Sequence, residues 1–518
     1  MSSEMMAWRE KCGVLGVLLP VSFSDQWRHL GQWLYLGLYA LQHRGQESCG
    51  MATFDHEQLN LHRGMGLVNQ VMTPDVLAPM TGQIGIGHTR YATTGSSSLE
   101  NAQPVVVRTR YGPLVIAHNG NLTNTEALWG ALPEDDRPPL MTGSSDTLVM
   151  AYTLRRALHK ANATTSDAVI AVFKAVLPTF EGAYCLTMAF GDCLLAARDP
   201  VGFRPLSVGK VIAAPGETMV GKPAWVVASE TCALDILGAQ FEFEVPPGEL
   251  VLFDSSGAMT RSSFLPAQSK PSQNKFCFFE LVYFARPDSV IRNQLVYETR
   301  LAMGRKLAER SCKQYPTIGA DMVIPVPDSG NVAAVGYSQA TGVPYMEGLI
   351  KNRYVGRTFI HPTQSMRERS IQLKLNPMKR MLEGKRVVVV DDSIVRGNTS
   401  KKLVAMLRQC GVKEIHLRIS SAPVKHPCFY GIDMSSGTEL LANRMSDAEI
   451  ADWLGVDSLV YLTTEDMQAV GNQNGDIQPF CYACFNGDYP TDVGHLLSEI
   501  DQTHVTQSLD ASLLSAAL

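Results

Sequence analysis

The pattern of apolar and polar positions along the chain predicts two unlike halves. In the first half, short apolar runs at 85–95 and 116–121 break into Gly, Asn or Thr beside one ionisable residue. Further runs predict strands with turns at 190–206, 225–230 and 248–254, the last of these being the final strand of this half. Binding and catalytic residues commonly lie where strands break into loops. The first half is therefore expected to be rich in strands, with flanking helices and site residues at strand ends.

A cysteine begins this first half. Residues 12–19, Cys-Gly-Val-Leu-Gly-Val-Leu-Leu, predict a buried strand with the cysteine at its start. Residues 36–50 predict an apolar helix that ends in a polar loop punctuated by glycine. The Gly-Ser-Ser-Asp stretch at 143–146 predicts a helix cap that carries one carboxylate. Residues 255–275, with many Ser and Pro, predict a linker to the second half.

The second half is organised around four consecutive valines. Residues 387–390 predict a strand buried on both faces, as in a parallel sheet, and Asp391 and Asp392 follow at its carboxyl end. A short buried strand ending in a Pro-Asp-Ser turn is expected at 322–329. After the acid pair comes a loop that leads into a predicted helix and contains Ser393, Gly397, Asn398 and Thr399.

This strand, acid pair and loop have the chemistry of a phosphoribosyl site. A loop that feeds a helix N-terminus offers free N–H groups and a positive dipole end to a phosphate. Two carboxylates suit the hydroxyls of a ribose, directly or through Mg²⁺. The alternative is an ordinary strand–loop–helix with two solvated acids. The stretch lacks the G-x-x-x-x-G-K-[ST] pattern of a nucleotide triphosphate loop.

Composition narrows the class of protein. A chain of 518 residues should hold two or more domains, and its 45% hydrophobic and 18% charged residues are ordinary for a globular protein. The net charge of −5 gives no support to nucleic-acid or membrane partners, and no apolar run approaches the ~20 residues of a membrane span. The N-terminus has no secretory pattern, and eleven scattered Cys predict a reducing, cytosolic location.

One segment departs from this average charge. Residues 351–386 hold ten Lys/Arg and two Glu, a local balance of +8. Most such runs are solvated basic faces. Beside a phosphoribosyl loop, a mobile basic flap for pyrophosphate is the preferred interpretation.

Residues 387–400 closely resemble the phosphoribosylpyrophosphate (PRPP) motif of the type I phosphoribosyltransferases. The resemblance implies a parallel-sheet α/β domain in which Asp391 and Asp392 bind Mg²⁺ together with Ser329. It implies that PRPP is bound by Asp391, Asp392, Ser393, Gly397, Asn398, Thr399, Lys351 and Arg357.

The first half resembles the class II glutamine amidotransferase domain, an N-terminal-nucleophile fold built as an αββα sandwich. Six stretches match in order over most of 12–250. They are Cys12-Gly-Val, His43-Arg-Gly-Gln-Glu-Ser48, His88-Thr-Arg-Tyr91, His118-Asn-Gly120, Ser144-Ser-Asp146 and Asp199-Pro-Val-Gly-Phe-Arg-Pro205.

The chemistry of glutamine hydrolysis suits these residues. Cys12 at a processed N-terminus would supply both nucleophile and base, because its own α-amine, with a reference pKa near 8, can take the thiol proton. The resemblance implies an oxyanion hole from the Asn119 side chain and the Gly120 N–H. It also implies that Arg90 binds the glutamine α-carboxylate and Asp146 the α-ammonium. The bland alternative for Cys12 is a core thiol.

Two further expectations accompany this resemblance. An internal Cys12 has an amide nitrogen, which cannot act as a base, so residues 1–11 are predicted to be a propeptide cleaved after Lys11. The alternative is a disordered polar tail. His88 and His118 are expected to be structural, hydrogen-bonding residues beside the site.

The combination of both halves resembles the glutamine phosphoribosylpyrophosphate amidotransferases over roughly residues 12–490. It implies an α+β glutaminase domain at 12–265, an α/β phosphoribosyltransferase domain at 275–470, and a C-terminal segment at 471–518. The implied reaction converts glutamine, PRPP and water to 5-phosphoribosylamine, glutamate and pyrophosphate, with ammonia passing between the sites. The resemblance also implies inhibition by purine nucleotides and a homotetramer or homodimer.

Two rival functions share parts of this pattern. Other class II amidotransferases, which make glucosamine phosphate or asparagine, lack a stretch like 387–399. A PRPP-sensing regulatory protein with a degenerate glutaminase is the remaining alternative. The intact set of Cys12, Arg90, Asn119, Gly120 and Asp146 argues against it.

Four further cysteines suggest a metal centre. Cys481 and Cys484 form a C-x-x-C pair, while Cys277 and Cys428 lie in aromatic surroundings. The pair alone leaves zinc or no metal equally open. Resemblance to one subgroup of the family implies a [4Fe–4S] cluster on all four, kept dry by neighbouring Phe side chains.

Overall fold

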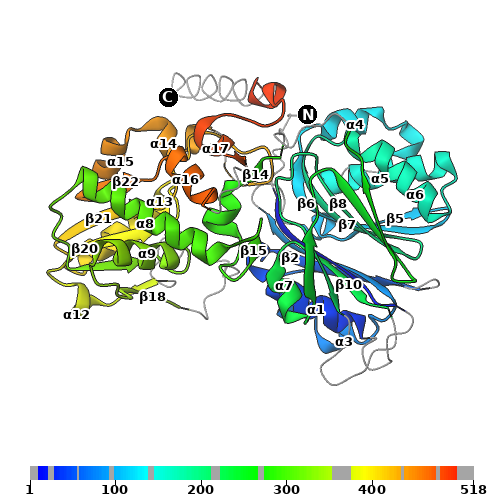
Figure 1. Cartoon of the computed structure of the whole chain (residues 1–518), viewed down its shortest axis with the longest axis horizontal. Coiled ribbons are helices and arrows are strands. Elements are labelled where there is room, and N and C mark those ends of the chain that lie inside the picture. The colour runs from blue at the N-terminus through cyan, green and yellow to red at the C-terminus, as the bar shows by residue number, and fades with distance from the viewer. Residues whose placement is uncertain are drawn as a thin grey trace, which may run out of the picture.

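The computed structural model describes residues 10–20, 29–54, 58–92, 98–137, 145–211, 222–266, 274–352, 375–432, 434, 437–473 and 479–498. Two halves lie side by side (Figure 1). The first runs to residue 266 and the second from residue 274.

The first half contains two antiparallel sheets that face each other. One has seven strands, in the order β11 (Gln240–Glu244), β9 (Ser207–Val211), β10 (Ala224–Ala228), β1 (Glu10–Leu18), β4 (Ile84–Ala92), β2 (Ser48–Phe54) and β3 (Leu59–Met65). The other has six, in the order β13 (Met259–Ser263), β12 (Glu249–Asp254), β8 (Cys193–Arg198), β7 (Gly182–Phe190), β6 (Gly112–Leu122) and β5 (Val105–Thr109). Apolar side chains from both sheets fill the space between them, including Val14, Ile86, Val115 and Ala189.

Helices cover the outer face of each sheet. The seven-stranded sheet packs against α1 (Leu30–Ala40), α2 (Val68–Val71) and α7 (Thr231–Ile236). The six-stranded sheet packs against α4 (Thr125–Ala131), α5 (Asp146–Ala161) and α6 (Ser166–Val176). Short helices α3 (Pro74–Leu77), η2 (Gln42–Arg44), η3 (Leu99–Asn101), η4 (Glu134–Asp136) and η5 (Leu177–Thr179) complete this half. The αββα sandwich expected from the sequence is confirmed.

The second half contains a parallel sheet. Its strands lie in the order β17 (Met322–Pro325), β20 (Arg386–Asp391), β21 (Glu414–Ile419) and β22 (Ser458–Tyr461). One face packs against α8 (Val296–Gln314) and α9 (Asn331–Thr341), and the other against α13 (Asn398–Gln409) and α15 (Asp447–Leu454). Val388 and Val390 lie in the first of these cores and Val387 and Val389 in the second. The predicted strand buried on both faces is therefore confirmed.

Shorter elements complete the second half. They are β14 (Phe276–Cys277), η7 (Glu280–Phe284), β15 (Val290–Ile291), β16 (Gln294–Leu295), β18 (Leu349–Lys351), β19 (Leu375–Pro377), α12 (Lys379–Leu382), η8 (Gly437–Glu439), α14 (Leu441–Arg444), α16 (Thr464–Gly471), β23 (Phe480–Cys481) and α17 (Ala483–Asn486). In the part of the chain described, no helix is both long and apolar enough to cross a membrane.

Several sequence expectations need correction. The predicted linker at 255–275 contains strand β13, so β12 is not the last strand of the first half. Strand β13 has no apolar pattern in the sequence, because backbone groups make its ladder with β12 and its polar residues are mostly exposed. The predicted helix at 36–50 begins earlier, at Leu30, and ends at Ala40. Ser145 occupies the N-cap of α5, but its side chain makes no capping hydrogen bond.

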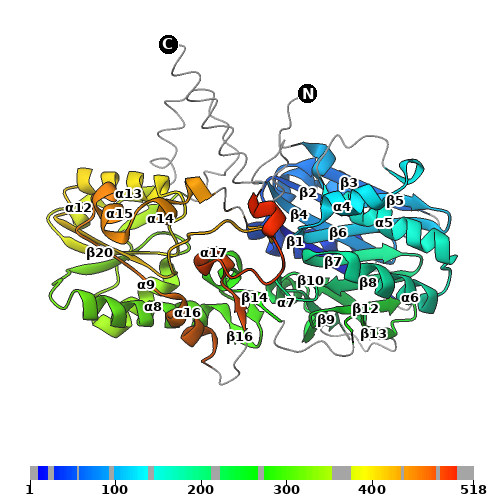
Figure 2. The ribbon, with the colours of Figure 1, turned by 90° about the horizontal axis from the view of Figure 1, so that it is seen from above.

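A shared core joins the two halves. Ala183 and Phe203 of the first half pack in one cluster with Phe276, Tyr430 and Phe485 of the second. The phenyl ring of Phe203 stacks on that of Tyr430 at a centroid distance of 4.1 Å. Figure 2 shows the chain beyond α17 crossing to the first half, where the His495 Nε2 lies 3.1 Å from the carbonyl oxygen of Thr123. The packed apolar side chains of this shared core therefore hold the two halves together.

Candidate active sites

The two sheets of the first half bring Cys12 and Asn119 to the same gap. Cys12 is fully buried, and it shares a face of β1 with Val14, which belongs to the core between the sheets. On β6, Asn119 likewise shares a face with Val115 of that core. Arg90 lies directly opposite Cys12 in the β1–β4 register. Because side chains alternate along a strand, all three predicted residues face the space between the sheets.

Two features of β6 suit an oxyanion hole. The Nδ2 of Asn119 is buried and has no hydrogen-bond partner in the described part of the chain. A buried donor without a partner is costly, so it marks a place where an acceptor can bind. Gly120 has φ +153°, and a Cβ there would lie 2.0 Å from the carbonyl oxygen of Ala183. Only glycine permits this approach of β6 to β7.

Asp146 is held at the carboxyl end of β6. Its Oδ2 accepts a hydrogen bond from the Leu122 N–H at 3.1 Å, and its Oδ1 accepts one from the Thr147 N–H at 2.6 Å. The Nδ1 of His118 lies 3.4 Å from Oδ1. Burial alone would raise the pKa of Asp146, but His118 and these hydrogen bonds hold it below its ordinary value. Asp146 is therefore an ionised carboxylate whose oxygens already have protein partners.

The two histidines behave as structural residues. The Nε2 of His88 lies 3.0 Å from the carbonyl oxygen of His118, which links β4 to β6 across the gap. Burial lowers the pKa of His88 to about 3, so its ring is neutral. This agrees with the role expected from the sequence. Ser144 lies outside the described residues.

A buried ionic network lies behind Cys12 and was missed in the sequence. The Nε of Arg44 donates to the carbonyl oxygen of Cys12 at 2.9 Å, and its Nη1 and Nη2 contact Glu230 at 2.6 Å and Glu280 at 2.8 Å. Arg204 Nη1 contacts the same Glu280 oxygen at 2.9 Å. These charged side chains are at most 4% exposed. The sequence contains one signal for this network: Glu280 is the only acidic residue in the aromatic run at 276–284.

At the end of β20, Asp391 and Asp392 lie in contact. The Asp392 N–H donates to Asp391 Oδ1 at 2.9 Å, and the Ser393 hydroxyl donates to Asp392 Oδ1 at 2.6 Å. The Ser329 side chain acts on both carboxylates and lowers the pKa of each. Burial raises the pKa of both acids, and the neighbouring Asp392 raises that of Asp391 further. Two crowded, desolvated carboxylates of this kind favour a bound cation.

The loop after the acid pair ends at a helix N-terminus. Gly397 is the N-cap of α13 with φ +75°, and a Cβ there would lie 2.6 Å from Leu441. Asn398 and Thr399 form the first turn of this helix of twelve residues. The first N–H groups of a helix lack intrahelical partners, so this end can bind an anion.

The structure describes part of the basic segment 351–386. Lys351, at the end of β18, forms an ion pair with Asp328 in the loop after β17. Arg357 and the central part of the predicted flap, at 353–374, lie outside the described residues.

The four predicted cluster cysteines come from three distant segments and lie near one another. Cys277 and Cys481 are opposite each other in the parallel pair β14–β23. The Cys484 carbonyl accepts hydrogen bonds from the N–H groups of Lys425 and His426, which draws in the segment that contains Cys428. All four thiols are nearly buried. Burial raises the pKa of Cys277 to about 12 and those of Cys481 and Cys484 well above the usual value.

Among the described residues, no three or more His, Cys, Asp or Glu side chains are arranged to hold one metal ion. The Cys484 thiol lies close enough to Cys277, Cys428 and Cys481 for each of them to raise its pKa. The donor set is nevertheless four soft sulfurs in an apolar, aromatic environment.

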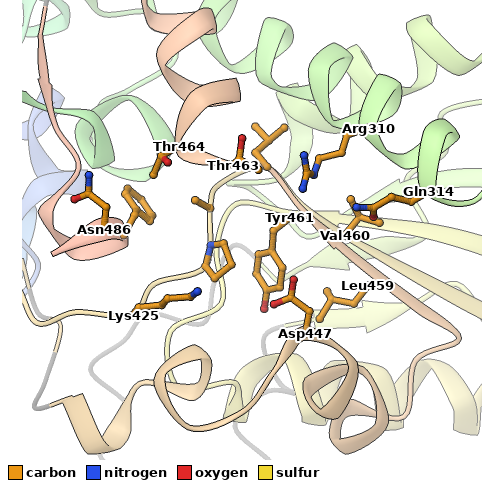
Figure 3. A pocket seen from close by; sticks show the side chains of 14 residues that line it. Arg310, Gln314, Lys425, Asp447, Leu459, Val460, Tyr461, Thr463, Thr464 and Asn486 are labelled. Carbon is orange, nitrogen blue, oxygen red and sulfur yellow. The ribbon is translucent and has the colours of Figure 1, made fainter. Parts of the chain in front are cut away.

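A separate pocket of about 270 Å³ opens at the carboxyl end of β22 (Figure 3). Arg310, Lys425, Tyr461 and Thr464 are among its lining residues. Its arginine is paired with Asp466 at 3.5 Å. Neither the acid pair of β20 nor Cys12 lines this pocket, so it is distinct from both candidate sites.

Comparisons with known proteins agree with both halves. The glutamine amidotransferase domain family matches residues 88–234, and the phosphoribosyl transferase domain family matches residues 297–423. An amidophosphoribosyltransferase of Synechocystis sp. is 47% identical over 93% of this chain and 92% of its own length. That of Methanocaldococcus jannaschii is 42% identical over 93% of this chain and 98% of its own length.

Solved structures extend this likeness to the whole fold. The allosteric regulatory enzyme of purine biosynthesis aligns with a TM-score of 0.81 at 41% identity, covering 93% of this chain and 97% of that one. The B. subtilis glutamine PRPP amidotransferase, complexed with ADP and GMP, aligns with a TM-score of 0.79 at 41% identity and covers 93% and 98%. With both domains in the same order and near-complete coverage, this chain belongs to the amidophosphoribosyltransferases, enzymes of purine biosynthesis.

Proposed function

We propose that the chain makes 5-phosphoribosylamine in two linked half-reactions, at Cys12 and at the acid pair of β20. Glutamine, PRPP and water are consumed, and glutamate and pyrophosphate are released. One observation carries this proposal: Cys12 and Asn119, whose Nδ2 has no hydrogen-bond partner among the described residues, face the same space between the sheets, in one chain with Asp391 and Asp392.

In the first half-reaction, the Cys12 thiolate attacks the glutamine side-chain amide. The developing oxyanion is stabilised by Asn119 Nδ2 and the Gly120 N–H. The α-amine of Cys12 takes the thiol proton and returns it to the leaving ammonia. Water then hydrolyses the thioester and releases glutamate. We assign the substrate α-carboxylate to Arg90 and the α-ammonium to Asp146, whose ionised form suits a cation.

The α-amine of Cys12 can act as a base only if Cys12 is the first residue of a processed chain. In the continuous chain, Glu10 and Lys11 pair with β4 opposite Ala92 and Tyr91, just before the Cys12 pairing with Arg90. Cleavage after Lys11 would therefore remove two residues from the start of β1 and leave Cys12 at its new end. The propeptide remains a prediction.

In the second half-reaction, ammonia attacks C1 of PRPP, the bond to pyrophosphate breaks, and the adduct loses a proton. We assign the ribose to Asp391 and Asp392 and its 5-phosphate to the N–H groups of Ser393, Gly397, Asn398 and Thr399. Mg²⁺ held by Asp391, Asp392 and Ser329 would neutralise charge on the departing pyrophosphate. Lys351 and Arg357 would supply the remaining positive charge.

The four-cysteine centre is proposed to hold a [4Fe–4S] cluster. Four soft sulfur donors, brought together in a buried aromatic core, support this proposal. When bound, the cluster would link segments of the second half that are distant in sequence, and the binding free energy would contribute to folding.

Regulation and assembly are further proposals. A relative was solved with ADP and GMP, which supports inhibition of this chain by purine nucleotides. Exposed apolar side chains on neighbouring elements, Leu36 and Tyr39 of α1, Ile236 of α7 and Phe241 of β11, support a homodimer or homotetramer. We also propose a cytosolic location, because the scattered cysteines of the sequence indicate a reducing compartment.

The test separates the two half-reactions. Cys12→Ala should abolish glutamine-dependent synthesis and retain synthesis from added ammonia, measured as pyrophosphate release. Wild-type glutamate release should rise on adding PRPP. A wild-type protein that binds PRPP but releases no glutamate would instead favour the rival function, a PRPP-sensing regulatory protein.

A further inference from the structure

Asn121, the residue after Gly120 on β6, makes a hydrogen bond across the boundary between the halves. Its Nδ2 donates to the carbonyl oxygen of Phe429 at 2.9 Å and to that of Leu122 at 3.1 Å. Asn121 is only 5% exposed. The neutral amide thus joins the end of the strand that carries Asn119 to a segment more than three hundred residues away.

The acceptor belongs to a firmly held segment. Tyr489 donates from its hydroxyl to the Pro427 carbonyl at 2.7 Å, and Arg204 Nη2 donates to the Tyr430 carbonyl at 2.6 Å. The Tyr430 N–H donates to the sulfur of Cys428 at 3.4 Å. Bonds on both sides of Phe429 fix its carbonyl, so Asn121 is attached to a fixed point.

The position of this attachment matters for the oxyanion hole. β6 ends at Leu122, one residue beyond Asn121. Gly120 has no side chain to anchor it, and the Asn119 amide has no partner that would hold it in the described part of the chain. Oxyanion donors act only when they lie about 2.7–3.1 Å from the developing charge. The Asn121 side chain therefore constrains the strand on the side of Gly120, as the His118 side chain, 3.4 Å from Asp146 Oδ1, does on the side of Asn119.

We propose that Asn121 is a positioning residue for glutamine hydrolysis: its hydrogen bond to Phe429 holds the end of β6 so that Asn119 Nδ2 and the Gly120 N–H stay aimed at the oxyanion. This inference rests on the proposed function of Asn119 and Gly120. It predicts that the second half of the chain, through residues 427–430, sets the alignment of the glutaminase site.

The test replaces Asn121 by leucine, which keeps the branching at Cγ, is larger, and removes the donor. Asn121→Leu should lower the kcat of glutaminase by roughly ten- to a hundredfold, as expected for a misplacement of about 1 Å or less. The KM for glutamine and the ammonia-dependent synthesis should stay within twofold of wild type. Alkylation of Cys12 by iodoacetamide, which forms no oxyanion, should keep its rate, measured on the Cys12 peptide by mass spectrometry.

A matched control comes from the same region. Asn124 Nδ2 donates to the Thr179 carbonyl at 2.9 Å, a bond of the same kind that stays within the first half. Asn124→Leu should leave the kcat of glutaminase within threefold. Three results would overturn the positioning role. The first is a loss of glutaminase kcat in Asn124→Leu equal to that in Asn121→Leu. The others are an equal loss of glutaminase and ammonia-dependent synthesis in Asn121→Leu, or a wild-type glutaminase kcat in that variant.

Two more variants keep the test decisive. If Asn121→Leu does not fold, Asn121→Asp keeps the shape, lacks the N–H donor and should show the same selective loss of kcat. Asn119→Ala separates the two levels of inference. If it leaves glutaminase unchanged, the proposed oxyanion hole is wrong. If it abolishes glutaminase while both Asn121 variants are fully active, only the positioning role is wrong.

Discussion

Replacing Glu280 by glutamine perturbs the buried charge cluster at the boundary between the halves. Glu280 is fully buried and accepts three hydrogen bonds, from Arg44 Nη1 at 3.0 Å, Arg44 Nη2 at 2.8 Å and Arg204 Nη1 at 2.9 Å. Glutamine keeps the shape but loses the charge. Its amide nitrogen would also face a guanidinium group, so one donor would oppose another.

The expected cost follows from these contacts. Hydrogen bonds to charged groups contribute about 1.5–3 kcal/mol each to stability. The sum over these three bonds is an upper limit on the stability lost in the variant. Both arginines keep a second acceptor, Arg44 in Glu230 at 2.6 Å and Arg204 in the Tyr430 carbonyl at 2.6 Å. We therefore expect a loss near that of a broken buried ion pair, about 3–5 kcal/mol.

Native-state hydrogen exchange measures this loss locally. The Ala285 N–H, bonded to the Glu280 carbonyl at 2.9 Å, reports on the perturbed segment. In Glu280→Gln, its exchange should accelerate by about two to three and a half orders of magnitude. Glu309→Gln removes the exposed pair with Lys306 and should cost less than about 1 kcal/mol. An acceleration below fivefold in Glu280→Gln would refute the claim that this charge stabilises the boundary.

The same comparison has a defined pH dependence. Burial would raise the pKa of Glu280, but Arg44 and Arg204 hold it below its ordinary 4.5 in the folded protein. A carboxyl with a lowered folded pKa contributes stability above its unfolded pKa and loses it as the pH falls through the folded value. The difference between wild type and Glu280→Gln should therefore be complete at pH 7 and shrink only below about pH 4.

Three further predictions concern the two sites and the cluster. The double variant Asp391→Asn with Asp392→Asn should lose PRPP-dependent synthesis and keep basal glutaminase. Without Mg²⁺ at pH 7, this variant should unfold at a higher urea concentration than wild type. The reason is that the raised pKa values of the two acids make their ionised forms unfavourable in the folded protein. Anaerobically purified protein should contain four iron and four acid-labile sulfide per chain, and Cys481→Ser should lose both, whereas zinc without sulfide would contradict the cluster. Active, glutamine-using enzyme should begin at Cys12 by mass spectrometry; active enzyme that retains Lys11 would contradict both the propeptide and the α-amine base.

Much of the second half was predictable because its signals are local. Four consecutive valines must be buried on both faces, and the acids and small residues after them can only lie at the strand's carboxyl end. The structure confirms the strand, the acid contact and the helix that starts after Gly397. In the first half, the resemblance of six ordered stretches to a known domain family was enough to name the fold.

Other features depended on contacts that no local pattern encodes. The sequence predicts a linker where strand β13 lies, because the pairing of β13 with β12 uses backbone groups while its side chains are polar. The contact of Arg44 with Glu280 joins residues 236 positions apart, and that of Asn121 with Phe429 joins residues 308 apart. The sequence by itself determined which segments become strands and helices, and which residue types can do the chemistry, since periodic burial and backbone geometry act over a few residues. Only the tertiary structure decided which distant polar groups share a buried boundary, because an unpaired donor or charge is costly there and its partner is set by how the two halves pack.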